Sequence, residues 1–503
     1  MNEKLPGFHP LQFPAVPADT EQGTVPLKKI WKIIREPLLR WSQSGWFWGG
    51  AFALCGLVYV LLKGIYLNND IDNSWTGAWI FNFWNRGITE DIIFFEGDAS
   101  YWGVRFFSHI FCWIYGFAGM VFGFTRDVWI GVSAFWMLTG FLIWYGIGKI
   151  LLPNRNAARV FLFLLVLAGV SVAAAMKIRT DAFVFAFNAL AFYLFLRGKY
   201  FWAVFCACIA VETHPVGICG ICYPAAYLLC CRREVFDLRH PGAFLRMAAG
   251  GLCGILLYLL LHWSTLAELL PVLSNATSGR SNFLYAHFFG RSSYPWRYLP
   301  ELLLFAAAFA GHFLVFGRRK FFFPLTVLLF LLFSFLIARG NFHYALFAYP
   351  AFLLLTVNLA DRLDRAVPVL LALGWLLLML PQYSFLIWRN SGGRDFNEYT
   401  ARLQSVKIPE NVRICGMPND YFAFMKHKGF RTLRLYRPDQ EAYIIRHEKT
   451  IYMQPDWEHI SEEAVRSAGV QRIAEFPLRS GGRVSVWHKL PASRNKPEEN
   501  DKP

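Results

Sequence analysis

The stretch GWFWGGAFALCGLVYVLLKGIYLNNDIDNSWTGAWIFNFWNRG, residues 45–87, joins two very different kinds of sequence. Its apolar run over 46–64 is close to the roughly 20 residues that a helix needs to cross a bilayer. Two aspartates and three tryptophans follow between residues 70 and 84. This contrast predicts a first membrane-spanning helix that ends in a polar segment at the membrane surface, where tryptophan is enriched.

The apolar pattern continues along the chain. Of the 503 residues, 55% are hydrophobic and 18% aromatic, with a mean hydropathy of +0.34. A soluble protein of this length is seldom so apolar, so we predict a polytopic α-helical membrane protein of about 11–13 spans. The candidate spans are 46–64, 106–124, 128–149, 157–176, 181–197, 200–213, 216–231, 243–262, 299–316, 321–338, 343–359 and 366–388. Whether 106–124 crosses completely, or whether it is 157–176 that does not, is left open.

Basic residues in short loops indicate the orientation, because such loops stay on the cytoplasmic side. Residues 1–45 form a basic tail without a recognisable cleavable signal. We therefore expect the protein in the cytoplasmic (inner) membrane, with its N-terminus on the cytoplasmic side. The transmembrane domain then covers 46–389. The segments expected on the outer side are the acidic loop 65–105, the loop 264–298 and everything after 389.

After residue 389 the composition changes to that of a soluble domain. Residues 390–490 are expected to form a small extracytoplasmic α/β domain, and 491–503 a disordered tail. The expected strands are 412–417, 450–454, 471–476 and 483–490, with a short helix over 461–469.

The net charge of +16 does not indicate a nucleic-acid partner. Much of it lies in short loops, where it orients spans and meets anionic lipid. Nine of the ten cysteines lie in apolar stretches, including Cys219 and Cys222 of the sequence CGIC. We interpret these cysteines as small packing residues and predict neither a redox motif nor a zinc site.

Three groups of residues could carry chemistry. The first is the acidic loop, which has six acids between residues 70 and 98 around an amphipathic stretch, 73–86, that is expected to form an interfacial helix. Carboxylates held at a membrane surface can serve as a base or bind a metal.

The second group stands at the ends of two consecutive apolar runs. Arg179 and Asp181 open one run, and Glu212 and His214 close the next. A hairpin of two spans brings these four residues to the same side of the membrane. They either pair with one another as helix-end charges or form part of a functional site.

The third group consists of cations and aromatic residues in the outer segments. Arg291, Arg339 and His343 lie where the positive-inside trend disfavours cations, so we expect an anionic partner there. Arginine forks match phosphate oxygens, and a lipid phosphate is the natural candidate. General adhesion to lipid head groups is the alternative.

Taken in order, these motifs resemble the GT-C membrane glycosyltransferases. The motifs are the acidic first outer loop, RTD at 179–181, ETHP at 212–215 and NFHY at 341–344. The resemblance covers roughly residues 45–390. Within the class it is nearest to the bacterial branch of protein O-mannosyltransferases and lipid A aminoarabinose transferases.

The resemblance implies transfer of a sugar from a polyprenyl-phosphate-linked donor to an acceptor on the outer face, with inversion. It assigns the general base to Asp72, with Asp70 as the runner-up, and an auxiliary acid to Glu96. Asn73 stands where relatives often have glutamate, and Gly97 where the aminoarabinose type has lysine. The donor phosphate is then expected to meet Arg105, Arg339, His343 and Tyr344, with supporting roles for Arg179, Asp181, Glu212, His214 and Arg291.

Several points stay open in this interpretation. A divalent ion, Mg²⁺ or Mn²⁺, would use Asp72 and Glu96 if the enzyme needs one. The acceptor is a glycan, a lipid or a protein. A transporter or flippase for a lipid-linked sugar is a different class of function, although its site would be expected near the midplane rather than at span ends. An inactive scaffold for envelope assembly is the third hypothesis.

Overall fold

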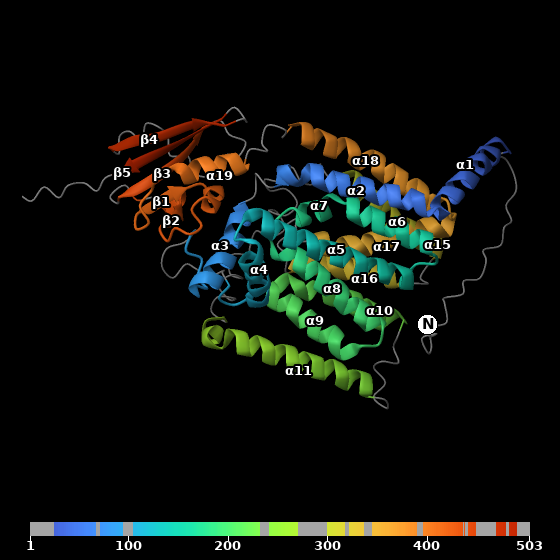
Figure 1. Ribbon diagram of the computed structural model, residues 1–503. Helices are drawn as coiled ribbons and strands as arrows, with labels where there is room; N and C mark the ends of the chain where they lie inside the picture. The colour runs from blue at the N-terminus through green and yellow to red at the C-terminus, as the bar shows by residue number, and fades with distance from the viewer. Residues whose placement is uncertain are drawn as a thin grey trace, which may run out of the picture.

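The computed structural model describes residues 25–66, 71–93, 104–231, 241–269, 299–316, 321–336, 345–389, 396–435, 437, 441–448, 469–478 and 482–489. Within these ranges the chain forms a helical bundle with a small sheet domain at one end (Figure 1). The bundle contains α1 (Val25–Gln43), α2 (Gly45–Tyr66), α3 (Ile71–Arg86), α4 (His109–Phe122), α5 (Arg126–Leu151), α6 (Arg155–Leu167), α7 (Gly169–Ala175), α8 (Thr180–Leu196), α9 (Tyr200–Thr213), η2 (Pro215–Ile221), α10 (Cys222–Cys231), α11 (Gly242–His262), η4 (Trp263–Thr265), α15 (Leu299–Phe316), α16 (Phe322–Leu336), α17 (Ala345–Leu363) and α18 (Val367–Arg389).

Helices occupy all twelve apolar segments that the sequence marks as candidate spans. Local polar residues fix where two of them begin: Thr125 Oγ1 accepts the Val128 N–H at 3.3 Å, and Asn154 Oδ1 accepts the Ala157 N–H at 2.8 Å. Such caps satisfy N–H groups that have no partner within the helix. The segment 157–176 is broken, because α6 and α7 meet at a bend of 61°.

Five helices are long and apolar enough to cross a membrane, or six if the bent pair α6–α7 counts as one span. Six further apolar helices in the described ranges are shorter, with 10–17 residues. The protein is therefore a multi-pass membrane protein of mostly helical fold, as predicted. The count of 11–13 spans stays a prediction.

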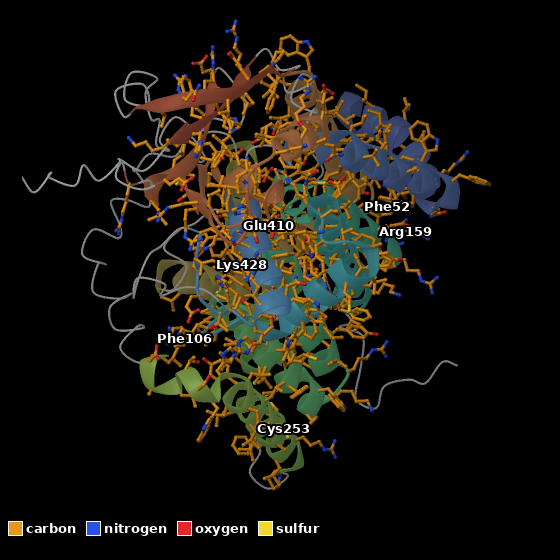
Figure 2. The ribbon with its side chains drawn as sticks, turned by 60° about the vertical axis from the view of Figure 1, so that its left-hand side comes forward. Phe52, Phe106, Arg159, Cys253, Glu410 and Lys428 are labelled. Atoms are coloured by element: carbon orange, nitrogen blue, oxygen red, sulfur yellow. The ribbon has the colours of Figure 1, made fainter. Side chains whose placement is uncertain are left out.

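The helices pack closely where glycine removes a side chain. A Cβ on Gly140 of α5 would lie 2.6 Å from the Phe185 ring of α8, and one on Gly250 of α11 would lie 2.3 Å from the Phe201 carbonyl oxygen of α9. The side chains of Phe52 on α2 and Cys253 on α11 mark opposite sides of the bundle (Figure 2). Helix α11 therefore lies at the edge of the bundle, against α9.

The sheet domain contains a five-stranded sheet in the order β2-β1-β3-β5-β4. Strands β1, β2 and β3 are parallel, whereas β5 runs antiparallel to both β3 and β4. Strands β1, β4 and β5 match predicted strands. Strands β2 and β3 and the helix α19 were not predicted. The predicted segments 450–454 and 461–468 lie outside the described residues. The elements are α19 (Phe396–Ser405), β1 (Arg413–Gly416), η7 (Pro418–Phe422), β2 (Phe430–Thr432), η8 (Leu433–Leu435), β3 (Ala442–Glu448), β4 (Val470–Pro477) and β5 (Arg483–Lys489).

The sheet domain rests on α3 rather than standing apart from the bundle (Figure 1). One hydrophobic cluster contains Trp129 of α5, Phe422 of η7 and Ile445 of β3. A Cβ on Gly77 of α3 would lie only 3.1 Å from the Phe422 ring, so α3 and η7 are in direct contact. The predicted amphipathic helix exists, and it lies beneath the sheet domain.

Residues 25–43 of the predicted N-terminal tail form the helix α1. Its Leu38 is buried against Ala366 and Val369 at the start of α18, and Arg35 Nε lies 2.9 Å from Asp364 Oδ2. Helix α1 lies at the opposite end of the bundle from the sheet domain (Figure 1).

Candidate functional site

The candidate site is built from the first turns of two helices. Asp72 lies in the first turn of α3, and Asp181 lies in the first turn of α8 with Arg179 just before that helix. The N-terminus of a helix carries a partial positive charge, which favours carboxylates there. Both helix starts therefore present an acid at the same end of the bundle.

Arg179 joins the two acids. Its Nη1 pairs with Asp72 Oδ2, and its Nε donates to Asp181 Oδ2 at 2.7 Å. The side chain of Asp72 is 23% exposed, whereas that of Asp181 is 4% exposed. One guanidinium thus holds a buried carboxylate on one side and a solvent-reaching carboxylate on the other, a geometry that its planar fork of donors permits.

The residues after Asp72 attach this cluster to the rest of the molecule. The fully buried Asn73 accepts the Ile178 N–H through its Oδ1 at 2.6 Å, which ties the start of α3 to the segment before α8. Ser74 Oγ donates to Asn419 Oδ1 of the sheet domain at 3.2 Å. Asn73 therefore has a structural contact of its own.

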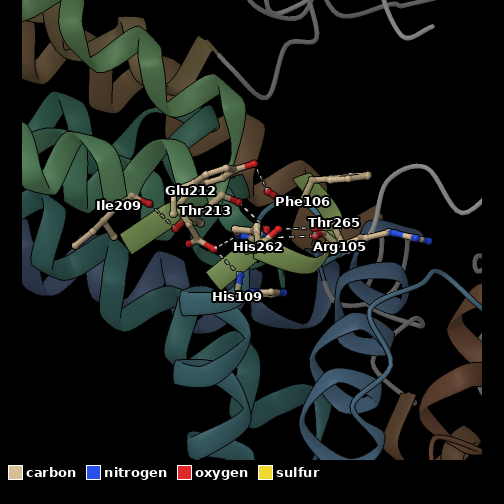
Figure 3. A network of polar contacts seen from close by, with 10 residues as sticks. Arg105, Phe106, His109, Ile209, Glu212, Thr213, His262 and Thr265 are labelled. Carbon is tan, nitrogen blue, oxygen red and sulfur yellow. Dashed lines mark hydrogen bonds and ion pairs between the residues drawn. The ribbon is translucent and has the colours of Figure 1, made fainter. Parts of the chain in front are cut away.

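Glu212 and His214 enter two different surroundings. The His214 ring lies within electrostatic range of Asp181 and Arg179, and its Nδ1 accepts the Val216 N–H at 3.1 Å. Glu212 instead belongs to a second network, shown in Figure 3. The four residues that the sequence grouped together therefore belong to two networks. His214 lies near Arg179 and Asp181, whereas Glu212 belongs to the second network.

The centre of the Glu212 network, where Glu212 meets two histidines, is buried. Glu212 Oε1 accepts the His109 N–H at 2.7 Å and lies 3.2 Å from His262 Nε2 of α11. The two histidine rings stack with centroids 4.1 Å apart. Glu212 is 2% and His262 1% exposed. This network joins the start of α4 to the ends of α9 and α11 (Figure 3).

The same network holds the segment that carries Arg105. The Arg105 carbonyl accepts from Thr265 Oγ1 at 2.9 Å and lies 3.1 Å from His262 Nδ1. Ser108, with a φ of 72°, donates its N–H to the Glu212 carbonyl at 2.7 Å. The Arg105 guanidinium meets Glu268 at 2.5 Å. The backbone of Arg105 is fixed, while its side chain is partly exposed and bound to an acid.

The remaining predicted site residues lie outside the described ranges. The described chain gives positions for Asp72, Arg105, Arg179, Asp181, Glu212 and His214. Sequence reasoning missed His262 and Asn419, because their partners are 50 and 345 residues away along the chain. The residues without a described position are Asp70, Glu96, Arg291, Arg339, His343 and Tyr344.

The described residues do not assemble a metal site. Among them, no three His, Cys, Asp or Glu side chains converge in a way that could hold a metal ion. Asp72 instead pairs with the guanidinium of Arg179. A metal ion held by Asp72 together with Glu96 stays a prediction, because Glu96 lies outside the described ranges.

Comparison with known proteins identifies the fold. No protein-family model and no curated protein sequence matches the chain. The crystal structure of ArnT from Cupriavidus metallidurans, bound to undecaprenyl phosphate, superposes with a TM-score of 0.55 at 14% identity. The match covers 88% of this chain and 98% of ArnT. This protein has the ArnT fold. The GT-C resemblance derived from the sequence motifs is therefore confirmed at the level of the fold, with the sheet domain included.

Proposed function

We propose that this protein is a membrane glycosyltransferase. It transfers a sugar from a polyprenyl-phosphate-linked donor to a glycan, lipid or protein acceptor, and the Asp72 end of the bundle faces the outer side of the cytoplasmic membrane. The observation that carries the proposal is the Asp72 carboxylate, which reaches solvent while Arg179 holds one of its oxygens. The ArnT fold supports it, because the ArnT structure contains undecaprenyl phosphate.

The residue types fit the chemistry of inverting transfer. The bond between the anomeric carbon and the phosphate oxygen breaks, and positive charge develops on the sugar ring. The acceptor hydroxyl attacks from the opposite face and gives its proton to the Asp72 carboxylate. Arg179 keeps that carboxylate in a fixed position, and Asp181 in turn holds Arg179.

Cations are required where the phosphate leaves, because negative charge accumulates there. Arg105, Arg339 and His343 are the proposed contacts, with Tyr344 as a hydrogen-bond donor. The Arg105 guanidinium pairs with Glu268 in the structure, so binding of the donor would replace that carboxylate with a phosphate.

Sugar transfer in membranes that overproduce the chain tests the proposal. Radiolabelled polyprenyl-phosphate sugars serve as donors and the total envelope as acceptor. Asp72→Asn is expected to lower transfer by at least about 100-fold, the usual contribution of a general base. Asp127→Asn is the matched control, because Asp127 lies in the first turn of α5 as Asp72 does in α3.

Three results would count against the proposal or its details. If Asp70→Asn alone abolishes transfer, the base is Asp70. If neither variant differs from an active wild type, the base is misassigned, and Glu96 or Asp181 is the next candidate. If the wild type consumes none of the donors, glycosyl transfer is wrong and the transporter and scaffold hypotheses gain support.

A further inference from the structure

A cavity of about 650 Å³ lies beside the Glu212 network, between α9, α10 and α11. It is a groove lined in part by small residues of α9, among them Ala203 and Ala207. Helix α11 approaches α9 so closely that a Cβ on Gly254 would lie 2.4 Å from Cys208 Cβ. The groove is the space left beside this contact.

The dimensions of the groove match one hydrocarbon chain. Its lining runs along α9 from Ala203 to Glu212, nine residue steps, which is about 14 Å at the rise of an α-helix. This length is roughly half of the ~30 Å hydrocarbon core, that is, one leaflet. The rim residues Ile221 and Ile255 are 52% and 57% exposed, so the groove opens sideways toward lipid.

One end of the groove carries a charge. Glu212 is the one acid among the described lining residues, and only its Oε1 is engaged, by the His109 N–H and His262. Its Oε2 is buried and makes no hydrogen bond to any residue in the part of the chain that the structure describes. Buried carboxylate oxygens normally accept hydrogen bonds, so this oxygen indicates a missing donor.

We propose that the groove binds one acyl chain of a membrane lipid whose head group donates a hydrogen bond to Glu212 Oε2. The donor is an ammonium N–H or a hydroxyl. A phosphate placed directly against Glu212 would meet a like charge, so the polyprenyl-phosphate donor of the proposed transfer does not fit this end. The lipid site is a separate property of the chain and does not depend on glycosyl transfer.

Photo-crosslinking tests this site with the full-length protein in phosphatidylcholine nanodiscs. Trace lipids with the same diazirine-bearing acyl chain carry an ethanolamine, glycerol or choline head group. Choline has no N–H donor. The groove face of α9, residues 203–211, is expected to be labelled by the ethanolamine or the glycerol lipid roughly 2- to 12-fold more than by the choline lipid, the equivalent of one hydrogen bond. The first two lipids distinguish an ammonium from a hydroxyl.

Two variants separate the parts of the proposal. Ala207→Phe fills part of the groove and is expected to reduce labelling there to background. Ala249→Phe makes the same change on the exposed face of α11 outside the groove and should leave labelling unchanged. Glu212→Gln keeps a carbonyl oxygen for the His109 N–H but removes the charge. The excess of labelling by the ethanolamine lipid over the choline lipid should therefore disappear.

Two outcomes would overturn the proposal. Equal labelling of the wild type by all three head groups would mean ordinary boundary lipid. Displacement of the label by undecaprenyl phosphate, but not by unlabelled ethanolamine lipid, would assign the groove to the polyprenyl donor. If Glu212→Gln unfolds in a thermal melt, the head-group preference of wild-type labelling and the loss of labelling in Ala207→Phe still test the proposed site.

Discussion

Two charged networks lie at the same end of the bundle, and they differ in what they expose. In the first, Arg179 joins buried Asp181 to Asp72, whose side chain is 23% exposed. In the second, Glu212 and His262 have side chains that are 3% and 1% exposed. Both contain a carboxylate and a basic group. Of the two, the first network has the carboxylate that is exposed to solvent, Asp72.

The partners of the two networks differ in the same way. The side chain of Arg179 pairs with both Asp72 and Asp181, so this network positions side-chain functional groups. Glu212 receives the backbone N–H of His109 through its side chain and that of Ser108 through its carbonyl. The second network therefore shapes the backbone around Arg105. We infer that chemistry belongs to the first network and local architecture to the second.

The largest effect is expected from Arg179→Gln. This change leaves the buried Asp181 carboxylate without its cation, which costs about 3 kcal/mol of unfolding free energy, at the low end for broken buried pairs because Asp72 is partly exposed. Sugar transfer is expected to be lost. Arg179→Lys should restore part of the stability but little of the transfer, because one ammonium does not replace a fork between two carboxylates.

Thermal melts and the transfer assay measure both properties of the Arg179 variants. Arg402→Gln is the matched control, since it removes a surface pair with Glu398 at 2.6 Å and should cost less than about 1 kcal/mol. Undiminished transfer by Arg179→Gln would show that the bridge to Asp72 has no part in catalysis.

Glu212→Ala is expected to have an intermediate effect. It leaves the buried His109 N–H without its acceptor, which costs about 1–3 kcal/mol. Because the network fixes the Arg105 backbone, the KM for donor should rise more than kcat falls. Glu212→Gln, which keeps the acceptor, should stay close to wild type in transfer. A fall in kcat with an unchanged KM would place Glu212 in the chemical step instead.

Ser74→Ala tests how the sheet domain supports the start of α3. It removes the buried bond to Asn419 and should cost about 1 kcal/mol. Ser405→Ala is the control, since the exposed Ser405 donates to the Arg402 carbonyl in its own helix. If Ser74→Ala lowers transfer by several-fold at a temperature where the protein stays folded, docking of the domain positions Asp72. Equal behaviour of both variants would separate the domain from the site.

The helices of the candidate spans were predictable because each follows an apolar run, and such a run has few alternatives to a helix in a bilayer. The sheet domain was less predictable. Strand β3, AYIIRHE over Ala442–Glu448, mixes apolar and charged residues, and β2 has only three residues. Their pairing with β1 depends on contacts across the domain, which leave no local pattern in the sequence.

The candidate site divides in the same way. Arg179, Asp181 and Asp72 were predicted from helix ends and the resemblance, and the structure brings them together. The placement of His214 and Glu212 in different networks could not be predicted, because it depends on His262 at the end of a later helix. The two positions are only two residues apart, and rotation around the end of α9 sends them to different neighbours.

The smallest effect is expected at the other end of the bundle, where α1 meets Asp364. Burial opposes ionisation of this acid, but the Ala366 N–H and the Arg35 side chain outweigh burial and hold the pKa of Asp364 below its ordinary value. The unfolded chain therefore takes up the proton first as the pH falls. The contribution to stability is complete above about pH 4 and is lost as the pH falls through the folded-state pKa. At pH 7, Asp364→Asn should destabilise the protein by less than about 1 kcal/mol, as for surface pairs. Melts at pH 7 and pH 3 measure the difference between the two proteins, which should shrink at the lower pH. A constant difference would mean that Asp364 acts through its hydrogen bonds alone, independently of its charge.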